Sequence, residues 1–310
     1  MLSPLPFASP GHVIEKATAA TPTPTAVAGA GGRLALESAR RATEAGLIEP
    51  CLVGDPEAIT AAASGIGWDL APYRCVSAKD ETKAAEAAVA LARGSEVAAL
   101  MKGQIHTDTL MRAVVDRENG LRAGRRMSHI FYMTAPDRQG ALTITDAAVN
   151  VAPDAAVKLD IINNAVDLLH ALGTPEPKIA VLSATDTPIA AMPSSLEAAE
   201  VVRRAVQGAV TGAVVDGPFA LDLAISPEAA TVKGVDSPVA GQADILLVPN
   251  IETGNALYKA MVYFMSATAA GLVMGAKVPI ILTSRADPPE ARLTAAALAA
   301  IVARHCAEDS

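Results

Sequence analysis

Two short polar segments near the carboxyl end of this chain carry side chains well suited to bind an anion. Pro249–Asn255 follows the apolar run Ile245–Val248, and Thr283–Asp287 follows the apolar run Val278–Leu282. Both apolar runs are typical of buried parallel strands, and open α/β sheets bind ligands at the carboxyl ends of their strands. Because the polar segments bring an amide, a hydroxyl and an arginine to those ends, the sequence predicts a site for an anionic ligand.

Ser284 and Arg285 are the first candidates for chemistry. The guanidinium of an arginine presents a rigid fork of donors that matches a phosphate group. A serine hydroxyl can donate a hydrogen bond to an oxyanion that develops during a reaction. The alternative interpretation is structural, with the serine capping the last helix and the arginine in a surface salt bridge.

A second candidate group is Gly254, Asn255 and Lys259, which we expect to bind substrate. Gly254 permits close approach of the backbone to a ligand, and Asn255 and Lys259, four residues apart, share one face of a helix. The N-terminus of a helix favours anions. The alternative is that Gly254 forms a turn and Lys259 is a solvated side chain.

A third group follows the predicted strand Val97–Met101 and contains Lys102 and His106, with Arg112 on the next helix. A strand end, a glycine and a nearby arginine again suit an anion. His106 can equally be a capping or structural residue.

Short apolar runs alternate with longer amphipathic segments along most of the chain, which favours α/β domains with parallel sheets. We expect residues 1–24 to form an extension. One domain is expected to contain residues 25–138 together with 275–310, and a second domain to contain residues 139–274, with the turn Asp137–Gly140 as the crossover. The uncharged stretch Ala260–Ala276 is predicted to be a buried helix rather than a membrane span.

The composition excludes some classes of function. The net charge is −8, and the basic residues are isolated, which disfavours binding to nucleic acid. The three scattered cysteines show no spacing typical of zinc ligands, so we expect no metal, and they are most compatible with the reducing cytoplasm. Neither a Walker loop nor a GxGxxG dinucleotide fingerprint is present.

Four segments together resemble the phosphate acetyl/butyryltransferase family, in particular its butyryltransferase-like branch, as in the phosphotransacetylase part of enoyl-CoA hydratase fusions. They are MKGQIHTDTLMR (101–112), VVDGPFALDLAIS (214–226), AGQADILLVPNIETGNALYK (240–259) and KVPIILTSRAD (277–287). The likeness extends from about residue 25 to residue 305, in the order of the family.

This resemblance implies two α/β lobes of the isocitrate/isopropylmalate-dehydrogenase-like type with a cleft between them, and a homodimer. It implies reversible acyl transfer, in which acyl-CoA and phosphate give acyl phosphate and CoA, with no cofactor besides these substrates. Ser284 and Arg285 match the Ser-Arg pair of the family's active site, and Arg112 matches an arginine that the family uses for the anionic substrate.

The chain departs from the family at one position. Some acetyltransferases carry an aspartate seven positions beyond the serine, which is proposed to deprotonate the CoA thiol, and this chain has Ala291 there. Glu290 and Asp287 are the nearby candidate bases. Two alternatives remain at this stage: a non-catalytic regulator that binds CoA or acyl phosphate, and an NAD-dependent oxidoreductase of the same architecture.

Overall fold

The computed structural model describes residues 2–136, 140–284 and 286–308, and within them the chain divides into two compact units. The terminal unit contains Ala8–Arg125 and Ala270–Ser310, and the middle unit contains Met1–Phe7 and Arg126–Ala269. The turn that we expected to be the crossover lies, apart from Gly140, outside the described residues. The domain boundaries that we inferred from the sequence therefore stay a prediction.

The terminal unit is built around one mixed sheet with the strand order β3-β2-β1-β4-β11-β10. Its strands are β1 (Thr23–Ala28), β2 (Ile48–Gly54), β3 (Arg74–Ser77), β4 (Ala99–Lys102), β10 (Thr268–Met274) and β11 (Ile280–Ile281). All neighbours are parallel except β10 and β11, which are antiparallel. The carboxyl ends of β1, β4 and β11 therefore lie at the same edge of this sheet.

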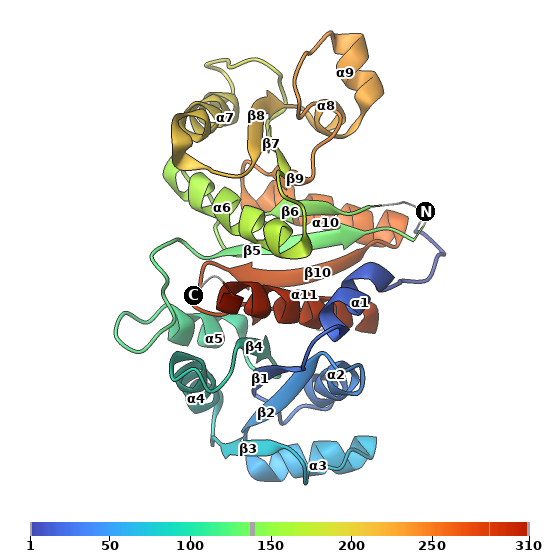
Figure 1. The fold of residues 1–310 in the computed structure, drawn as a ribbon, viewed down its shortest axis with the longest axis vertical. Helices are drawn as coiled ribbons and strands as arrows, with labels where there is room; N and C mark the ends of the chain where they lie inside the picture. Colours follow the sequence, from blue (N-terminus) through green and yellow to red (C-terminus); the bar gives the residue numbers. More distant parts are fainter. Residues whose placement is uncertain (1, 137–139, 285, 309–310) are drawn as a thin grey trace. The chain divides into compact units, whose positions relative to one another are not determined.

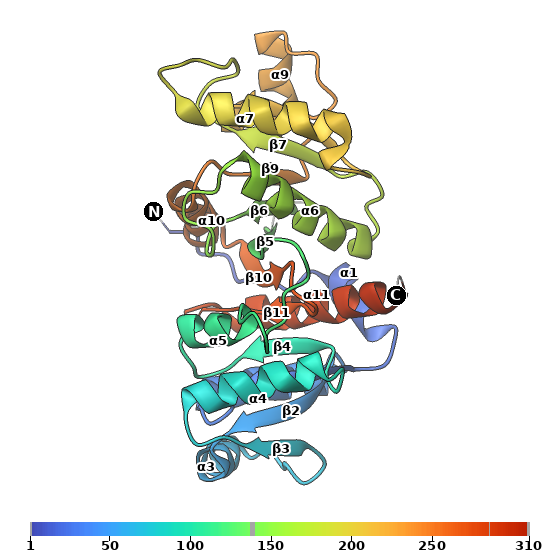
Figure 2. The same cartoon turned by 90° about the vertical axis from the view of Figure 1, so that its left-hand side faces the viewer.

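Helices cover both faces of this sheet (Figures 1 and 2). They are α1 (Gly11–Thr18), α2 (Arg33–Glu44), α3 (Pro56–Ile66), α4 (Glu81–Arg93), α5 (Thr107–Val114) and α11 (Pro289–Glu308). Helices α4 and α5 lie on one face, and α2, α3 and α11 lie on the other. Within residues 1–24, α1 packs against α11, where Arg304 donates to the carbonyl oxygens of Lys16 and Ala17 at 3.1 and 2.8 Å.

The strands of the middle unit have the order β5-β6-β9-β7-β8. The strands are β5 (Ser128–Thr134), β6 (Leu142–Thr145), β7 (Lys178–Leu182), β8 (Val214–Phe219) and β9 (Ile245–Leu247). Only the pair β5–β6 among these is antiparallel. The predicted α/β class is confirmed, but the prediction of purely parallel sheets was wrong at one strand pair in each unit.

Helices also flank the sheet of the middle unit (Figure 1). They are α6 (Ala155–Leu172), α7 (Pro193–Arg204) with its continuation Ala205–Ala209, α8 (Leu221–Ile225), α9 (Pro227–Lys233) and α10 (Ile251–Met265). Helices α6 and α7 pack on one face, and α8 and α10 pack on the other. The core between the sheet and α8–α10 contains Phe131, Ile144, Leu223 and Leu246.

Local sequence signals explain where the helices begin. The carboxylate of Asp55 accepts from the backbone N–H of Glu57 at 3.0 Å and thereby caps α3. Asp80 caps α4, Asp154 caps α6 and Asn250 caps α10 in the same way, at 2.8, 2.9 and 3.0 Å. These caps fix the ends of the loops that follow the strands.

The stretch Ala260–Ala276 corrects one prediction. Its first part completes α10, but Thr268–Met274 forms strand β10, in which every residue is buried. Ser266 ends the helix in a left-handed conformation, with φ 51°. A fully buried strand of small apolar residues has no alternating pattern, so periodicity alone does not distinguish it from a buried helix. No helix in the described ranges is both long and apolar enough to cross a membrane.

Candidate active site

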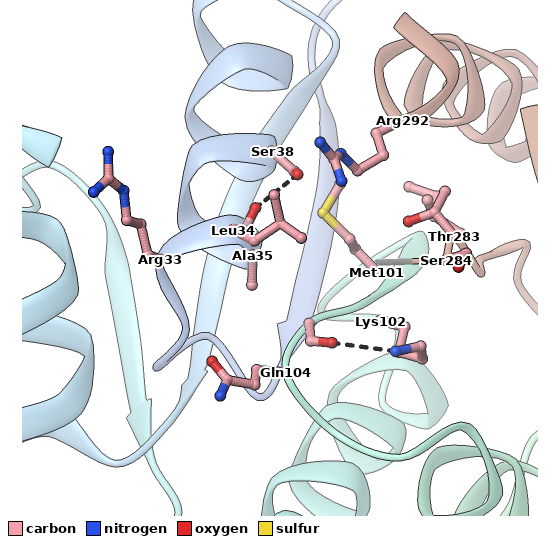
Figure 3. Close-up of a pocket in the computed structure, with 12 residues that line it drawn as sticks. Arg33, Leu34, Ala35, Ser38, Met101, Lys102, Gln104, Thr283, Ser284 and Arg292 are labelled. Atoms are coloured by element: carbon pink, nitrogen blue, oxygen red, sulfur yellow. Dashed lines mark hydrogen bonds between the residues drawn. The ribbon is translucent and has the colours of Figure 1, made fainter. Parts of the chain in front are cut away.

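A pocket of about 310 Å³ lies in the terminal unit, at the sheet edge where β4 and β11 end and α2 begins (Figure 3). We call it the Ser284 pocket. Its described lining residues are Arg33, Leu34, Ala35, Ser38, Met101, Lys102, Gly103, Gln104, Ile281, Thr283, Ser284 and Arg292. The position agrees with the expectation that ligands bind at the carboxyl ends of parallel strands.

The charge of this pocket favours an anion. Lys102 and Arg292 contribute positive charge, whereas the side chain of Arg33 is 75% exposed and pairs with Glu37 at 2.8 Å. The described lining contains neither aspartate nor glutamate. The first turn of α2 also lines the pocket and contains no acidic residue, so the partial positive charge of that helix N-terminus is not neutralised locally. The arrangement can hold an oxyanion and stabilise negative charge that develops next to it.

Ser284 is exposed in the loop that follows β11. Its backbone N–H donates to Oδ2 of Asp287 at 2.6 Å, and its Oγ accepts from the N–H of Ala286 at 3.3 Å. Because Oγ acts as the acceptor in that contact, the hydroxyl hydrogen can still be donated to a ligand. Arg285, the other half of the predicted pair, lies outside the described residues.

Neither candidate base is among the described residues that line the pocket. Burial raises the pKa of Asp287, while the N–H of Ser284 and the charge of Arg292 act in the opposite direction. Glu290 lies in the first turn of α11, and its backbone carbonyl accepts from the hydroxyl of Thr294 at 2.8 Å. Ala291 is completely buried, so its position faces the interior of the terminal unit.

Lys102 lines the same pocket as Ser284, because β4 and β11 are neighbouring parallel strands. Its Nζ donates to the carbonyl oxygens of Ile105 at 3.1 Å and Gly103 at 3.4 Å. Gly103 is required by close packing, since a Cβ there would lie 2.4 Å from the carbonyl oxygen of Gly29. The loop after β4 is therefore held tightly against the loop after β1.

Arg112 and His106 do not line the Ser284 pocket. Arg112 lines another cavity, of about 490 Å³, whose lining comes from α4, α5 and the residues after α5. His106 is exposed and precedes α5, and its Nδ1 lies 2.8 Å from Oε2 of Glu81. The N–H of His106 donates to the same oxygen at 3.1 Å, so a structural contact accounts for the position of this histidine.

The second predicted group, Gly254, Asn255 and Lys259, belongs to the middle unit. Gly254 is buried in the first turn of α10, where a Cβ would lie 2.7 Å from Cβ of Ala147. Asn255 donates to the carbonyl oxygen of Ala147 at 3.4 Å, and Lys259 is exposed. Gly254 thus allows α10 to approach the loop after β6, whereas the sequence led us to expect an approach to a ligand.

The sequence analysis missed Arg33 and Arg292. Arg33 follows a glycine-rich turn after β1, and that strand–turn–helix pattern was an available signal. Arg292 has no local motif, and only the fold brings it to the pocket. Within the described residues, no three His, Cys, Asp or Glu side chains gather as a metal site would require.

Comparisons with known proteins identify the family of the chain. A family model described as phosphate acetyl/butaryl transferase matches residues 77–300. The chain therefore belongs to the phosphate acetyl/butyryltransferase family.

The chain is similar to phosphate acetyltransferases and to phosphate butyryltransferases. A phosphate acetyltransferase of Rhizobium meliloti is 46% identical over 292 residues, which are 94% of this chain and 92% of the relative. A phosphate butyryltransferase of Clostridium acetobutylicum is 42% identical over 278 residues, or 90% and 92% of the two chains. The crystal structure of a branched-chain phosphotransacylase from Enterococcus faecalis superposes with a TM-score of 0.78 at 32% identity, covering 91% of this chain and 99% of that one.

Proposed function

We propose that this chain is a phosphate acyltransferase, which reversibly transfers a short acyl group between CoA and inorganic phosphate. Acyl-CoA and phosphate give acyl phosphate and CoA. The observation that carries the proposal is the Ser284 pocket, a cationic pocket without a carboxylate among its described lining residues, in a chain of this family.

In the proposed mechanism the CoA thiolate attacks the carbonyl carbon of the acyl phosphate, the carbonyl oxygen becomes an oxyanion, and phosphate leaves with the electron pair. Ser284 donates to the oxyanion. Its exposed hydroxyl and the use of Oγ as an acceptor from Ala286 support this role. Arg285 is proposed to hold the phosphate group of acyl phosphate, and Arg112 is proposed to contact an anionic part of a substrate.

The thiolate does not require a dedicated base. A thiol with a pKa near 8.5 is already ionised to a few per cent at pH 7. Neighbouring cations lower the pKa of a thiol further, and Lys102 lines the pocket. Asp287 remains the better of the two candidate bases, because burial raises its pKa, and Glu290 is the second.

Several further features belong to the same proposal. Lys102, His106, Gly254, Asn255 and Lys259 are proposed to contribute to substrate binding. The two compact units support a two-lobed arrangement of the isocitrate-dehydrogenase-like type, and the cleft expected between the lobes stays a prediction. We also propose a homodimer in the cytoplasm that uses no cofactor besides its substrates.

A second candidate is a regulator that binds CoA or acyl phosphate without turnover. The observation that favours it is the lack of a carboxylate in the described lining of the pocket, together with the buried Ala291.

The test is the release of CoA from acetyl-, propionyl- and butyryl-CoA, with and without phosphate, measured with a thiol reagent. The exposed cysteines Cys75 and Cys306 react with such a reagent, so a blank without substrate is subtracted. Release that depends on phosphate supports the transferase, and the order of rates gives the preferred acyl chain. Calorimetric binding of CoA without release from any substrate would favour the regulator.

A further inference from the structure

Arg292 is a cationic group in the Ser284 pocket to which the proposed mechanism gives no role. It lies in the first turn of α11, next to the buried Ala291. Figure 3 shows its side chain extending from α11 toward Ser38 of α2 and Met101 of β4. The guanidinium therefore reaches the wall of the pocket that also contains Ser284.

This guanidinium makes no side-chain hydrogen bond or ion pair with any described residue, and its Nη1 atom is buried without an acceptor. A buried charged donor without an acceptor is unfavourable, and native proteins seldom leave one unsatisfied. Arg304, three turns further along the same helix, instead donates to two backbone carbonyls. Arg292 thus has donors available for a ligand.

Nearby carboxylates do not take this role. The charges of Asp287, Glu37 and Glu290 raise the pKa of Arg292, but none of these carboxylates accepts a hydrogen bond from its guanidinium. Oδ2 of Asp287 already accepts from the N–H of Ser284. Burial lowers the pKa of Arg292, and the like charge of Arg41 acts in the same direction. An anion bound in the pocket would compensate both effects.

We propose that Arg292 binds a phosphate group of the substrates in the Ser284 pocket. This inference rests on the proposed function. The planar fork of a guanidinium matches two phosphate oxygens, and Lys102 lines the same pocket as a second positive charge. The phosphate is either that of inorganic phosphate and acyl phosphate or one that belongs to CoA, and the chemistry of recognition is the same.

The test compares Arg292→Met, which removes the charge, with Arg292→Lys, which keeps a charge but removes the fork. Arg41→Met is the matched control, because Arg41 is an exposed arginine near Arg292 that is not among the described residues lining the Ser284 pocket. The KM for phosphate is measured at saturating acyl-CoA, and the KM for acyl-CoA at saturating phosphate. Thermal unfolding monitors the fold of each variant.

Arg292→Met is expected to raise one KM by about 10- to 100-fold, as the loss of hydrogen bonds from a charged group predicts, and Arg292→Lys is expected to raise it less. A rise in the KM for phosphate alone assigns Arg292 to inorganic phosphate, whereas a rise for acyl-CoA alone assigns it to a phosphate of CoA. If the KM values of Arg292→Met for both substrates match those of Arg41→Met, the proposal is overturned. A loss of kcat in Arg292→Met without a change in either KM also overturns it. If Arg292→Met does not fold, Arg292→Lys decides by the same criterion.

The failure of the proposed function would be visible separately, because the unmodified protein would then release no CoA. In that case calorimetry with CoA and with inorganic phosphate replaces the kinetics. Weaker binding of either ligand to Arg292→Met than to Arg41→Met supports the role of Arg292, and equal binding overturns it.

Discussion

Replacing Ser284 by alanine tests the central step of the proposed reaction. The substitution removes one hydroxyl from an exposed loop residue. The backbone N–H of Ser284 keeps its 2.6 Å contact with Asp287, and among the described residues Oγ makes one hydrogen bond, which it accepts from the N–H of Ala286 at 3.3 Å. Because surface substitutions of this kind change the free energy of unfolding by less than about 0.5 kcal/mol, the fold is expected to persist.

The expected effect on catalysis is much larger. Loss of one hydrogen-bond donor to an oxyanion lowers kcat by roughly 10²–10³, which corresponds to about 2.7–4 kcal/mol in the activation barrier. In the Ser284 pocket the cations Lys102 and Arg292 remain, so residual activity is expected. The KM for phosphate should change little, because the hydroxyl acts on the carbonyl oxygen and not on the phosphate.

The assay is the phosphate-dependent release of CoA at saturating substrates, together with the unfolding temperature. Ser64→Ala provides a matched control, since Ser64 is an exposed serine of α3 whose Oγ donates to the carbonyl oxygen of Thr60 at 2.9 Å. If Ser284→Ala retains the kcat of Ser64→Ala, the hydroxyl has no part in the mechanism. If the rise in KM for phosphate accounts for the whole loss, Ser284 binds phosphate and the oxyanion argument is refuted.

Three further predictions concern the stability of the protein. Gly254→Ala should destabilise the protein by about 1–3 kcal/mol through crowding, whereas Gly65→Ala, in a helix with open space around it, should stabilise it by about 0.5–1 kcal/mol; equal unfolding midpoints in urea would contradict this reading. Glu197→Ala leaves the 2% exposed Lys158 side chain without its partner and should cost about 3–5 kcal/mol. Lys158→Met should cost less, because the 31% exposed Glu197 can be hydrated, and the reverse order in thermal unfolding would refute the argument. Burial raises the pKa of Asp287, so its carboxyl group holds a proton more tightly in the folded state than in the unfolded chain. The stability of the unmodified protein relative to Asp287→Asn should therefore fall as the pH rises above about 4, the pKa of an aspartate in an unfolded chain. A difference independent of pH would be evidence against this.

The carboxyl-terminal strands and their loops were predictable because several local signals agreed. The apolar runs 245–248 and 278–282 contain strands β9 and β11, although each strand is shorter than its run. The strand near residues 97–101 was also predicted, and its parallel pairing with β11 brings Lys102 and Ser284 to one pocket. Residues that follow neighbouring parallel strands are placed together by topology, but the pairing of β4 with β11 was not predicted from the sequence.

Other parts of the site depended on tertiary contacts that local sequence does not encode. Arg292 reaches the pocket only because α11 packs beside α2. Arg112 follows a strand end in sequence, but the direction of α5 carries it to a different cavity. A glycine at a helix start is compatible with ligand contact and with close packing. A Cβ at Gly254 would lie 2.7 Å from Cβ of Ala147, so packing alone already requires glycine there.

The terminal unit is assembled from two segments that leave the ribosome far apart in time. Strand β11 lies between β4 and β10, and all of residues 126–269 are synthesised after β4 and before the bulk of β10. One edge of β4 therefore has no partner strand while most of the chain is being made, and unpaired strand edges promote aggregation. The lining of the Ser284 pocket is also incomplete until α11 emerges, so an amino-terminal nascent chain can form β1–β4 but not the anion site.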